Sequence, residues 1–318
     1  TLKSLFATFY TFKNGIQDSV KYGFKHNDSL KTISIQRKII EPIANQKKEV
    51  SKENKAFEKA KKKADAKNKS VYGYDPQTKK NNRNLEFIEK DSSIAVLKIR
   101  GFSNGNYKKF YKQAFSKIEA NKSKTLILDL RNNGGGRIPE IAELYSYLAD
   151  STFVFLDKSE VVSKTSLLKQ SALKNAPLYI KIISAPFYYP YMYFSVHKNK
   201  DGKYYYSTET KQHKLSQNAF KGKIYVLING GSFSASSIIS SNLKGSKRAV
   251  FVGEETGGAF NGTVAGQMPL IRLPNSKVGI VVGLMKIAAL HKTNNEGRGI
   301  FPDKEISPTL EDRISGND

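Results

Sequence analysis

Residues 125–136 read Thr125-Leu126-Ile127-Leu128-Asp129-Leu130-Arg131-Asn132-Asn133-Gly134-Gly135-Gly136, a continuous apolar run that ends in three glycines. Such a run, without regular polar alternation, is typical of a strand in a sheet that is covered on both faces. Residues 94–99 and 223–228 predict two further strands. The apolar spacing in 107–120 predicts a helix, and a second helix is expected over 139–149. Alternating strands and helices predict an α/β fold with a layered core.

The chain is expected to consist of three segments. In the first, residues 1–45, apolar and polar side chains alternate over short stretches, which predicts a small antiparallel β-unit. Residues 46–90 are predicted to be a lysine-rich helix or linker, and residues 91–318 the layered domain. Within that domain, the tyrosine-rich stretch 188–206 is expected to form strands and loops beside the functional site.

The charge balance is strongly basic. The 318 residues include 53 Lys and Arg against 28 Asp and Glu, a net charge of +25. This excess favours anionic partners, but no nucleic-acid-binding motif is present, so a solvated basic surface without a specific nucleic-acid partner is the preferred interpretation. Residues 47–69 hold ten lysines against four acidic residues and almost no apolar ones. They predict an exposed helix or a mobile insertion; the functional alternative is an electrostatic docking arm that binds an anionic membrane surface or nucleic acid.

Several chemistries are excluded by composition. The chain has no cysteine, which removes disulfides, thiol catalysis and cysteine-based zinc sites. No cluster of residues has metal-ligand spacing, so neither a metal nor another cofactor is expected. No apolar run approaches the roughly 20 residues that a membrane span needs. No signal peptide is visible, and because the pattern at Thr1 begins abruptly, an N-terminally trimmed chain is expected.

A second informative stretch, residues 228–237, runs from an apolar strand through two glycines into a serine-rich helix start. This order places a serine at the turn, where unpaired N–H groups and the positive end of the helix stabilise an alkoxide or an oxyanion. Helix capping by serine is the alternative. The glycines of 134–136 let the backbone approach a ligand closely, or else form only a turn. Neither GxxxxGK[ST] nor GxGxxG occurs, which argues against phosphate binding.

Taken together, the motifs resemble peptidase family S41, the tail-specific and tricorn-like serine peptidases. The resemblance covers roughly residues 91–318 and implies the layered core of that family, which is related to the ClpP and crotonase spiral folds. It also implies that residues 1–45 are the end of a PDZ-like module. The motifs occur in the family's order: Asp129 to Gly136, Ser232 to Ser237, Val252 to Gly258, and finally 299–303 with 308–312.

The resemblance implies roles for individual residues. The middle serine of the family's Ser-x-Ser-x-Ser run is its nucleophile, which corresponds to Ser234. The family's oxyanion hole corresponds to the amides of Ala235 and Gly135. Ser232 and Ser236 are then expected to pack around the turn and cap the helix.

The general base departs from the family pattern. Where the tail-specific branch has its catalytic lysine, this chain has Ala259. The tricorn-like branch uses a histidine on the first core strand, oriented by a late glutamate, and these positions correspond to Lys98 and Glu296. We therefore predict Lys98 as the base and Glu296 as the residue that orients it or polarises the site. The alternatives are that Lys98 lies at an edge with its ammonium in water, or that His291 is the base.

The implied function is that of a serine endopeptidase that hydrolyses peptide bonds through an acyl-enzyme, processing protein C-terminal regions or degrading peptides. A polypeptide is the expected partner. Because the family lysine is missing, a catalytically impaired binding protein for peptides or apolar ligands is the alternative. Bacterial members of the family work in the cell envelope, some as lipoproteins, which implies a periplasmic or outer-surface location.

Overall fold

The computed structural model describes residues 10, 13–15, 17–26, 29–36, 66, 69–76, 78–88, 92–103, 105–170, 177–206 and 210–315. The chain forms two compact units, Thr1–Lys61 and Lys62–Asp318. In the first unit, β1 (Ser19–His26) and β2 (Ser29–Gln36) pair as an antiparallel hairpin, as their alternation predicts. A hairpin alone does not identify a PDZ-like module, which stays a prediction. Most of the lysine-rich stretch 47–69 lies outside the described residues.

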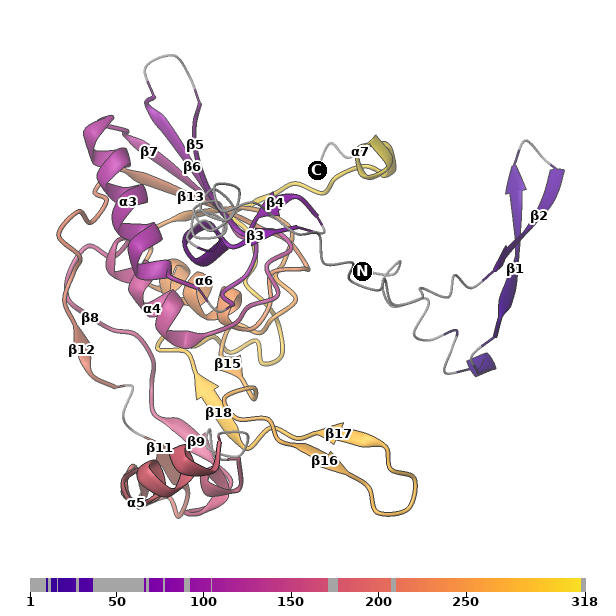
Figure 1. The fold of residues 1–318 in the computed structure, drawn as a ribbon. Helices are drawn as coiled ribbons and strands as arrows, with labels where there is room; N and C mark the ends of the chain where they lie inside the picture. The colour runs from indigo at the N-terminus through magenta and orange to yellow at the C-terminus, as the bar shows by residue number, and fades with distance from the viewer. Residues whose placement is uncertain are drawn as a thin grey trace, which may run out of the picture. The chain divides into compact units, whose positions relative to one another are not determined.

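A six-stranded sheet forms the centre of the second unit (Figure 1). Its strand order is β19-β14-β13-β7-β6-β5, and all neighbours are parallel except the edge pair β5 and β6. The sequence predicts three of these strands correctly, since β6, β7 and β13 match the apolar runs. The strands are β5 (Arg83–Ile88), β6 (Ile94–Ile99), β7 (Thr125–Asp129), β13 (Lys223–Ile228), β14 (Val250–Gly253) and β19 (Lys304–Glu305).

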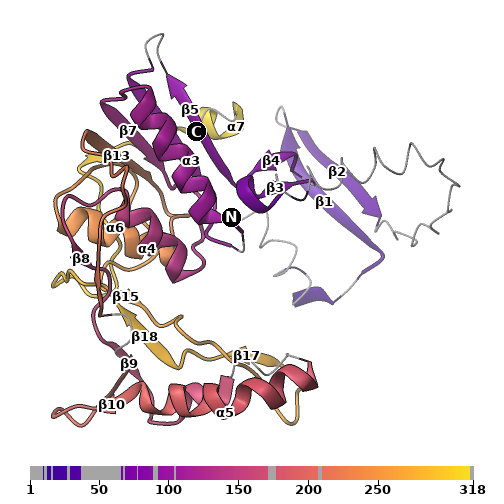
Figure 2. The same ribbon diagram turned by 60° about the vertical axis from the view of Figure 1, so that its left-hand side comes forward.

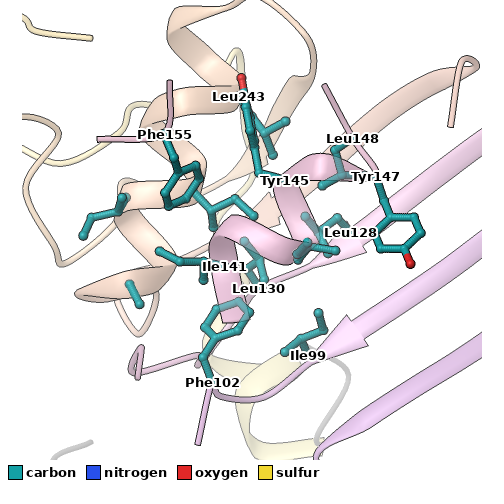
Figure 3. Close-up of a cluster of buried hydrophobic side chains, with 14 of the residues drawn as sticks. Ile99, Phe102, Leu128, Leu130, Ile141, Tyr145, Tyr147, Leu148, Phe155 and Leu243 are labelled. Carbon is teal, nitrogen blue, oxygen red and sulfur yellow. The ribbon is translucent and has the colours of Figure 1, made fainter. Parts of the chain in front are cut away.

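Three helices bury an apolar face of this sheet. They are α3 (Tyr107–Ala120), α4 (Ile138–Ser146) and α6 (Ala235–Gly245). Figure 3 shows Ile99 and Leu128 of the sheet facing Ile141 and Tyr145 of α4, with Leu243 of α6 close by. In β6 every second side chain is buried, so its other side chains point to the opposite face. The layered α/β fold is thereby confirmed, with its core between the sheet and these helices.

The layered core begins earlier in the chain than residue 91. β5, within the segment expected to be a linker, pairs along its whole length with β6. Its first residue, Arg83, is fully buried, donates to the Val71 carbonyl at 2.8 Å and stacks over the Tyr107 ring at 3.9 Å. The sequence alone predicts a helix or linker here because the strand's charged residues obscure its apolar signal.

A second sheet and several peripheral elements extend from the core at the lower end of Figures 1 and 2. This five-stranded sheet has the order β10-β11-β9-β18-β15. The elements are β9 (Ser159–Val161), β10 (Val196–Lys198), β11 (Tyr204–Tyr206), β15 (Gly262–Thr263), β18 (Met285–Ala288), α5 (Leu178–Phe194) and the hairpin β16 (Leu270–Arg272) with β17 (Gly279–Val281). Shorter elements are β3 (Tyr74–Asp75), β4 (Lys80–Asn81), β8 (Phe153–Val154), β12 (Gln212–His213), the 3₁₀ helix η1 (Ser166–Gln170) and α7 (Leu310–Ser315).

The tyrosine-rich stretch is only partly strand. Helix α5 takes up its first part, although Pro186 and Pro190 lie inside the helix. Proline removes a helical hydrogen bond, so the sequence alone predicts that this part of the chain is not a helix. The two prolines are four residues apart and therefore fall on one side of α5, which leaves the hydrogen bonds of the other side intact. Strands β10 and β11 follow as expected.

Candidate active site

The serine turn and the glycine loop meet at one edge of the central sheet. They follow the adjacent parallel strands β13 and β7, whose carboxyl ends open on the same side, where ligands bind in open α/β sheets. Several hydrogen bonds join the loops directly; among them, Phe233 N–H donates to the Asn133 carbonyl at 2.9 Å, and Ser232 Oγ–H donates to the Leu130 carbonyl at 2.8 Å. The packing role expected for Ser232 is therefore seen as a specific bond.

Ser234 has an unusual backbone conformation. It precedes α6 with φ 55° and ψ −120°, a region that non-glycine residues rarely adopt. Its side chain makes no capping hydrogen bond to the helix, so capping does not explain the serine. A strained serine on a sharp strand-to-helix turn is the geometry by which hydrolases expose a nucleophile.

Two glycines enclose Ser234. Gly135 has φ +99°, and a Cβ added to it would lie 2.7 Å from Ser234 Cβ and 2.9 Å from the Ala235 nitrogen. A Cβ on Gly258 would lie 2.8 Å from the Ser234 nitrogen. The glycine loop thus approaches the turn so closely that no side chain fits between them, which gives the glycines a geometric role beyond flexibility.

The two amides expected to form an oxyanion hole differ in their surroundings. Ala235 N–H is the first amide of α6, a position that has no partner within a helix, and the helix dipole adds positive potential there. Gly135 N–H donates to Oδ1 of Asn133 at 2.9 Å. Asn133 is fully buried and is itself held by a bond from its Nδ2 to the Ile99 carbonyl at 2.8 Å. Ala235 is therefore the freer of the two donors.

A cavity of about 360 Å³ opens beside Ser234. Its volume falls in the range of small-ligand sites. Two ionisable side chains line it, Lys286 from β18 and Glu296 from the loop that precedes β19, and neither forms an ion pair within the described part of the chain. The other lining residues are Phe233, Ser237, Gly257, Gly258, Ala259, Asn261, Gly262, Thr263, Val264 and Gly297.

Glu296 thus lies in the cavity, as expected, together with Lys286, which the sequence analysis does not single out. Ala259, at the family's lysine position, lines the same cavity and leaves room there. A signal for Lys286 does exist in the sequence, because it is a single charged residue in the alternating run Met285–Ala288. The same pattern drew attention to Lys98, and the sequence alone does not show which of the two strands borders the serine.

Lys98 does not line this cavity. Its Nζ lies 2.7 Å from Oδ2 of Asp129, and the same carboxylate accepts two bonds of 3.0 Å from the guanidinium of Arg131. Strand alternation turns Lys98 toward the face opposite α4 and α6. Burial opposes ionisation of Asp129, but the hydrogen bonds from Arg131 and Lys98 outweigh it and lower the pKa of that carboxyl. Lys98 is thus part of an ion-pair network in the sheet rather than an edge lysine in water.

His291 lies at the opposite end of α6 from Ser234. Its ring packs against Gly245, the last residue of the helix, where a Cβ would lie 2.2 Å from His291 Cγ. Burial lowers the pKa of His291. An eleven-residue helix is about 16 Å long, so the structure does not bring this histidine to the serine.

Hydrogen bonds fix the cavity wall to the late loop that carries Glu296. The buried hydroxyl of Thr256 donates to the Gly258 carbonyl and accepts from Ile300 N–H, both at 2.8 Å. Further along, the Asn261 side chain both donates to and accepts from the Thr293 backbone at 2.8 Å. The wall and the loop therefore form one unit, which positions Glu296 relative to Ser234.

Two further structural results concern the described residues alone. None of their helices combines the length and the apolarity needed to cross a bilayer. No group of three or more His, Asp or Glu residues among them is arranged to hold a metal ion.

The chain is similar to two curated bacterial proteases. It is 25% identical over 230 residues to a tail-specific protease of Haemophilus influenzae, a match that covers 71% of this chain and 26% of the relative. It is 27% identical over 231 residues to a carboxy-terminal-processing protease of Bartonella bacilliformis, covering 72% of this chain and 42% of the relative. The chain therefore spans less than half the length of either relative.

A solved structure shares the fold. Mature CPAF in complex with lactacystin superposes with a TM-score of 0.55 at 15% identity, covering 95% of this chain and 66% of that one. Residues 93–306 match peptidase family S41, and this range contains both glycine-loop and serine motifs as well as Glu296. The protein is therefore a member of peptidase family S41.

Proposed function

We propose that the chain is a serine endopeptidase in which Ser234 is the nucleophile. The observation that carries the proposal is the strained conformation of Ser234, which holds the serine at the mouth of a cavity and uses no capping bond. Strain of this kind costs about 1–3 kcal/mol and persists where surrounding structure enforces it, typically at functional sites. Here Gly135 and Gly258 enforce it from two sides.

The oxyanion hole uses the amides of Ala235 and Gly135. Ala235 N–H is available at the start of α6. Gly135 N–H would exchange the Asn133 carboxamide oxygen for the oxyanion of the substrate. Preorganised backbone donors of this kind stabilise the tetrahedral intermediate by about 3–4 kcal/mol for each donor.

Lys286 is the general base in this proposal. Both ionisable groups in the cavity belong to side-chain classes that transfer protons in enzymes, and we assign the transfer to Lys286 because a neutral amine is a stronger base than a carboxylate. Ser234 Oγ attacks the carbonyl carbon as its proton passes to Lys286 Nζ; the C–N bond then breaks, the leaving amine takes the proton, and water hydrolyses the acyl-enzyme. Glu296 orients the ammonium that forms.

Lys98 stays the base predicted from the sequence, and the two lysines are distinguished by experiment. Lys98 donates to the Asp129 carboxylate at 2.7 Å, so its ammonium already has a partner other than Ser234. The position of Lys98 on the other face of the sheet argues in the same direction. Lys286 has the advantage that it lines the cavity of the serine.

The substrate and location belong to the proposal as well. The names of the two curated relatives support a role in processing protein C-terminal regions. We propose a polypeptide substrate and a bacterial cell-envelope location, which subcellular fractionation of the native host tests. Recovery of the protein with cytosolic markers alone would contradict the location without affecting the chemistry.

Labelling with a fluorophosphonate probe tests the nucleophile and the base together. The probe reacts with activated serines and needs no knowledge of the peptide substrate. We expect labelling of the unaltered chain, none of Ser234→Ala, and a rate about 100-fold lower for Lys286→Met, the smaller end of what a general base contributes. Lys98→Met is expected to react at nearly the original rate.

A rescue variant makes the assignment sharper. Ala259→Lys places an amine at the family's usual position in the same cavity, so Ala259→Lys with Lys286→Met is expected to regain labelling. Unchanged labelling of Lys286→Met alone would remove Lys286 as the base, and a loss specific to Lys98→Met would give the role to Lys98. No labelling of the unaltered chain would instead favour a binding protein, for which the alanine at position 259 is the supporting observation.

A further inference from the structure

Helix α5 exposes an unusually large apolar surface. Of its 17 residues only Met192 is buried. Leu178 is 72% exposed, Ile183 68% and Phe187 78%. A surface helix of a soluble protein normally turns such apolar side chains toward the core. At 3.6 residues per turn, the exposed members cover more than half of the helix circumference. The large apolar side chains exposed on α5 are Leu178, Tyr179, Ile180, Ile182, Ile183, Phe187, Tyr189, Tyr191, Tyr193 and Phe194.

The opposite side of α5 packs against the rest of the protein and fixes the position of the exposed apolar surface. Met192 is buried, and Tyr188 packs against the apolar core. Lys164 lies over the Tyr193 ring at 4.6 Å. The helix is therefore docked along one side, while the exposed apolar side lies outside the core and outside the Ser234 cavity.

The segment around α5 is strongly basic. Between residues 158 and 206 the sequence has eight lysines and no arginine against two acidic residues, Glu160 and Asp201. Lys203 is neutralised by Glu160, with 3.1 Å between Nζ and the carboxylate. Lys198 and Lys200, which follow the helix directly, are exposed. An apolar surface next to uncompensated positive charge is complementary to a partner that has an apolar interior and a negatively charged surface.

We propose that α5 inserts sideways into the headgroup region of an anionic lipid bilayer and docks the peptidase on it. Tyrosines suit this position because the ring is apolar and the hydroxyl remains in the polar layer. The lysines bind the anionic headgroups, each strengthening binding by about fivefold, which corresponds to roughly 1 kcal/mol. A second copy of the chain fits the surface less well, because both copies carry the same excess of lysine at this place.

A tryptophan reporter tests the insertion at the residue in question. The chain has no tryptophan, so Phe187→Trp supplies a single fluorophore at the most exposed apolar position of α5. With phosphatidylcholine vesicles containing phosphatidylglycerol, its emission is expected to shift to shorter wavelength, and the shift is expected to reverse at high salt. Ile35→Trp, on the exposed face of β2, is the matched control and is expected not to shift.

The opposite results are equally specific. An unchanged emission of Phe187→Trp with anionic vesicles would overturn the proposal. A shift that grows with protein concentration in the absence of lipid would overturn it as well, because a second copy would then cover the helix.

Sedimentation with vesicles tests how much the lysines and the apolar side chains each contribute to binding, because each variant removes one of the two groups. We expect no sedimentation with anionic vesicles for a triple variant that carries Ile182→Ser, Ile183→Ser and Phe187→Ser. We expect binding at least tenfold weaker for a double variant that carries Lys198→Glu and Lys200→Glu. Leu30→Ser with Ile33→Ser and Ile35→Ser is the matched control, which is expected to bind normally. Equal binding of all variants would overturn the proposal. Fluorophosphonate labelling of Ser234 in each variant reports separately on the peptidase site.

Discussion

The backbone of Ser234 stores strain that a glycine would release. Its φ of 55° costs a residue with a Cβ about 1–2 kcal/mol but costs glycine almost nothing. We expect Ser234→Gly to unfold at a higher denaturant concentration than Ser234→Ala, by about 1 kcal/mol in free energy of unfolding. The comparison with alanine isolates the conformation, since both variants lack the hydroxyl. Equal stabilities would show that the turn is not strained.

Gly135 is expected to tolerate no side chain. In Gly135→Ala the new Cβ would overlap Ser234 Cβ at 2.7 Å, and the residue would keep a φ of +99°. We expect a loss of about 1–3 kcal/mol in stability and loss of fluorophosphonate labelling. Gly134→Ala is the matched control, because a Cβ there meets nothing within 4 Å. Labelling of Gly135→Ala at the original rate would contradict this packing.

At the scale of single residues, the sequence predicts the serine turn but does not single out Lys286, the base that we propose. Ser234 and the glycine loop follow strands that are neighbours in the sheet, so local motifs suffice to bring them together. Lys286 comes from a strand of the second sheet, and no local pattern reveals that β18 borders the cavity. The position of a base depends on packing between distant strands, which a single sequence does not report.

Between β6 and β7, the Asp129 carboxylate connects two strands through Lys98 and Arg131. Removing its charge in Asp129→Asn leaves both cations without their partner in a largely buried place. We expect a loss of about 3 kcal/mol, the low end for a buried ion pair, because the two cations are partly exposed. Asp157→Asn, whose ion pair with Lys292 is half-exposed, should change stability by less than about 1 kcal/mol.

The Asp129 carboxylate also makes the stability of the protein depend on pH in the acid range. Because the folded protein lowers the pKa of Asp129, its contribution is complete above the ordinary value of 3.8 and is lost as pH falls below it, through the lowered pKa. Urea unfolding of the original chain is therefore expected to show a steeper decline below about pH 4 than unfolding of Asp129→Asn. Parallel pH profiles would show that the network does not contribute to folding.

Element types also show where a sequence is informative. The parallel strands carry long apolar runs in which every second side chain is fully buried, so β6, β7 and β13 are predicted almost to the residue. Strand β5 lies at the edge of the sheet and carries charge, and α5 contains two prolines, so both contradict the local rules that usually identify them. Their conformations depend on tertiary contacts, which override weak local preferences.

At the scale of the whole molecule, the position of β5 determines where the shortest stable fragment can begin. A fragment of residues 91–318 lacks the edge strand and the buried Arg83, and exposes the unpaired side of β6. We expect it to aggregate, because an exposed edge strand pairs with other chains. A fragment that begins at residue 62 is expected to stay monodisperse in size-exclusion chromatography and to melt cooperatively. A cooperatively melting 91–318 fragment would place the boundary back at residue 91.

The spacing of the site along the chain also determines when activity can arise during synthesis. The proposed active site combines Gly135 of the glycine loop with Glu296 of the cavity, a separation of 161 positions, and β19 joins the sheet later still. A ribosome adds about 5–20 residues each second, so roughly 10–30 s pass between translation of the glycine loop and of the glutamate. For the last 62 of these positions, from Ser234 to Glu296, the nascent chain carries the proposed nucleophile without its complete cavity, and it is not expected to cleave peptides before residue 296 has been made.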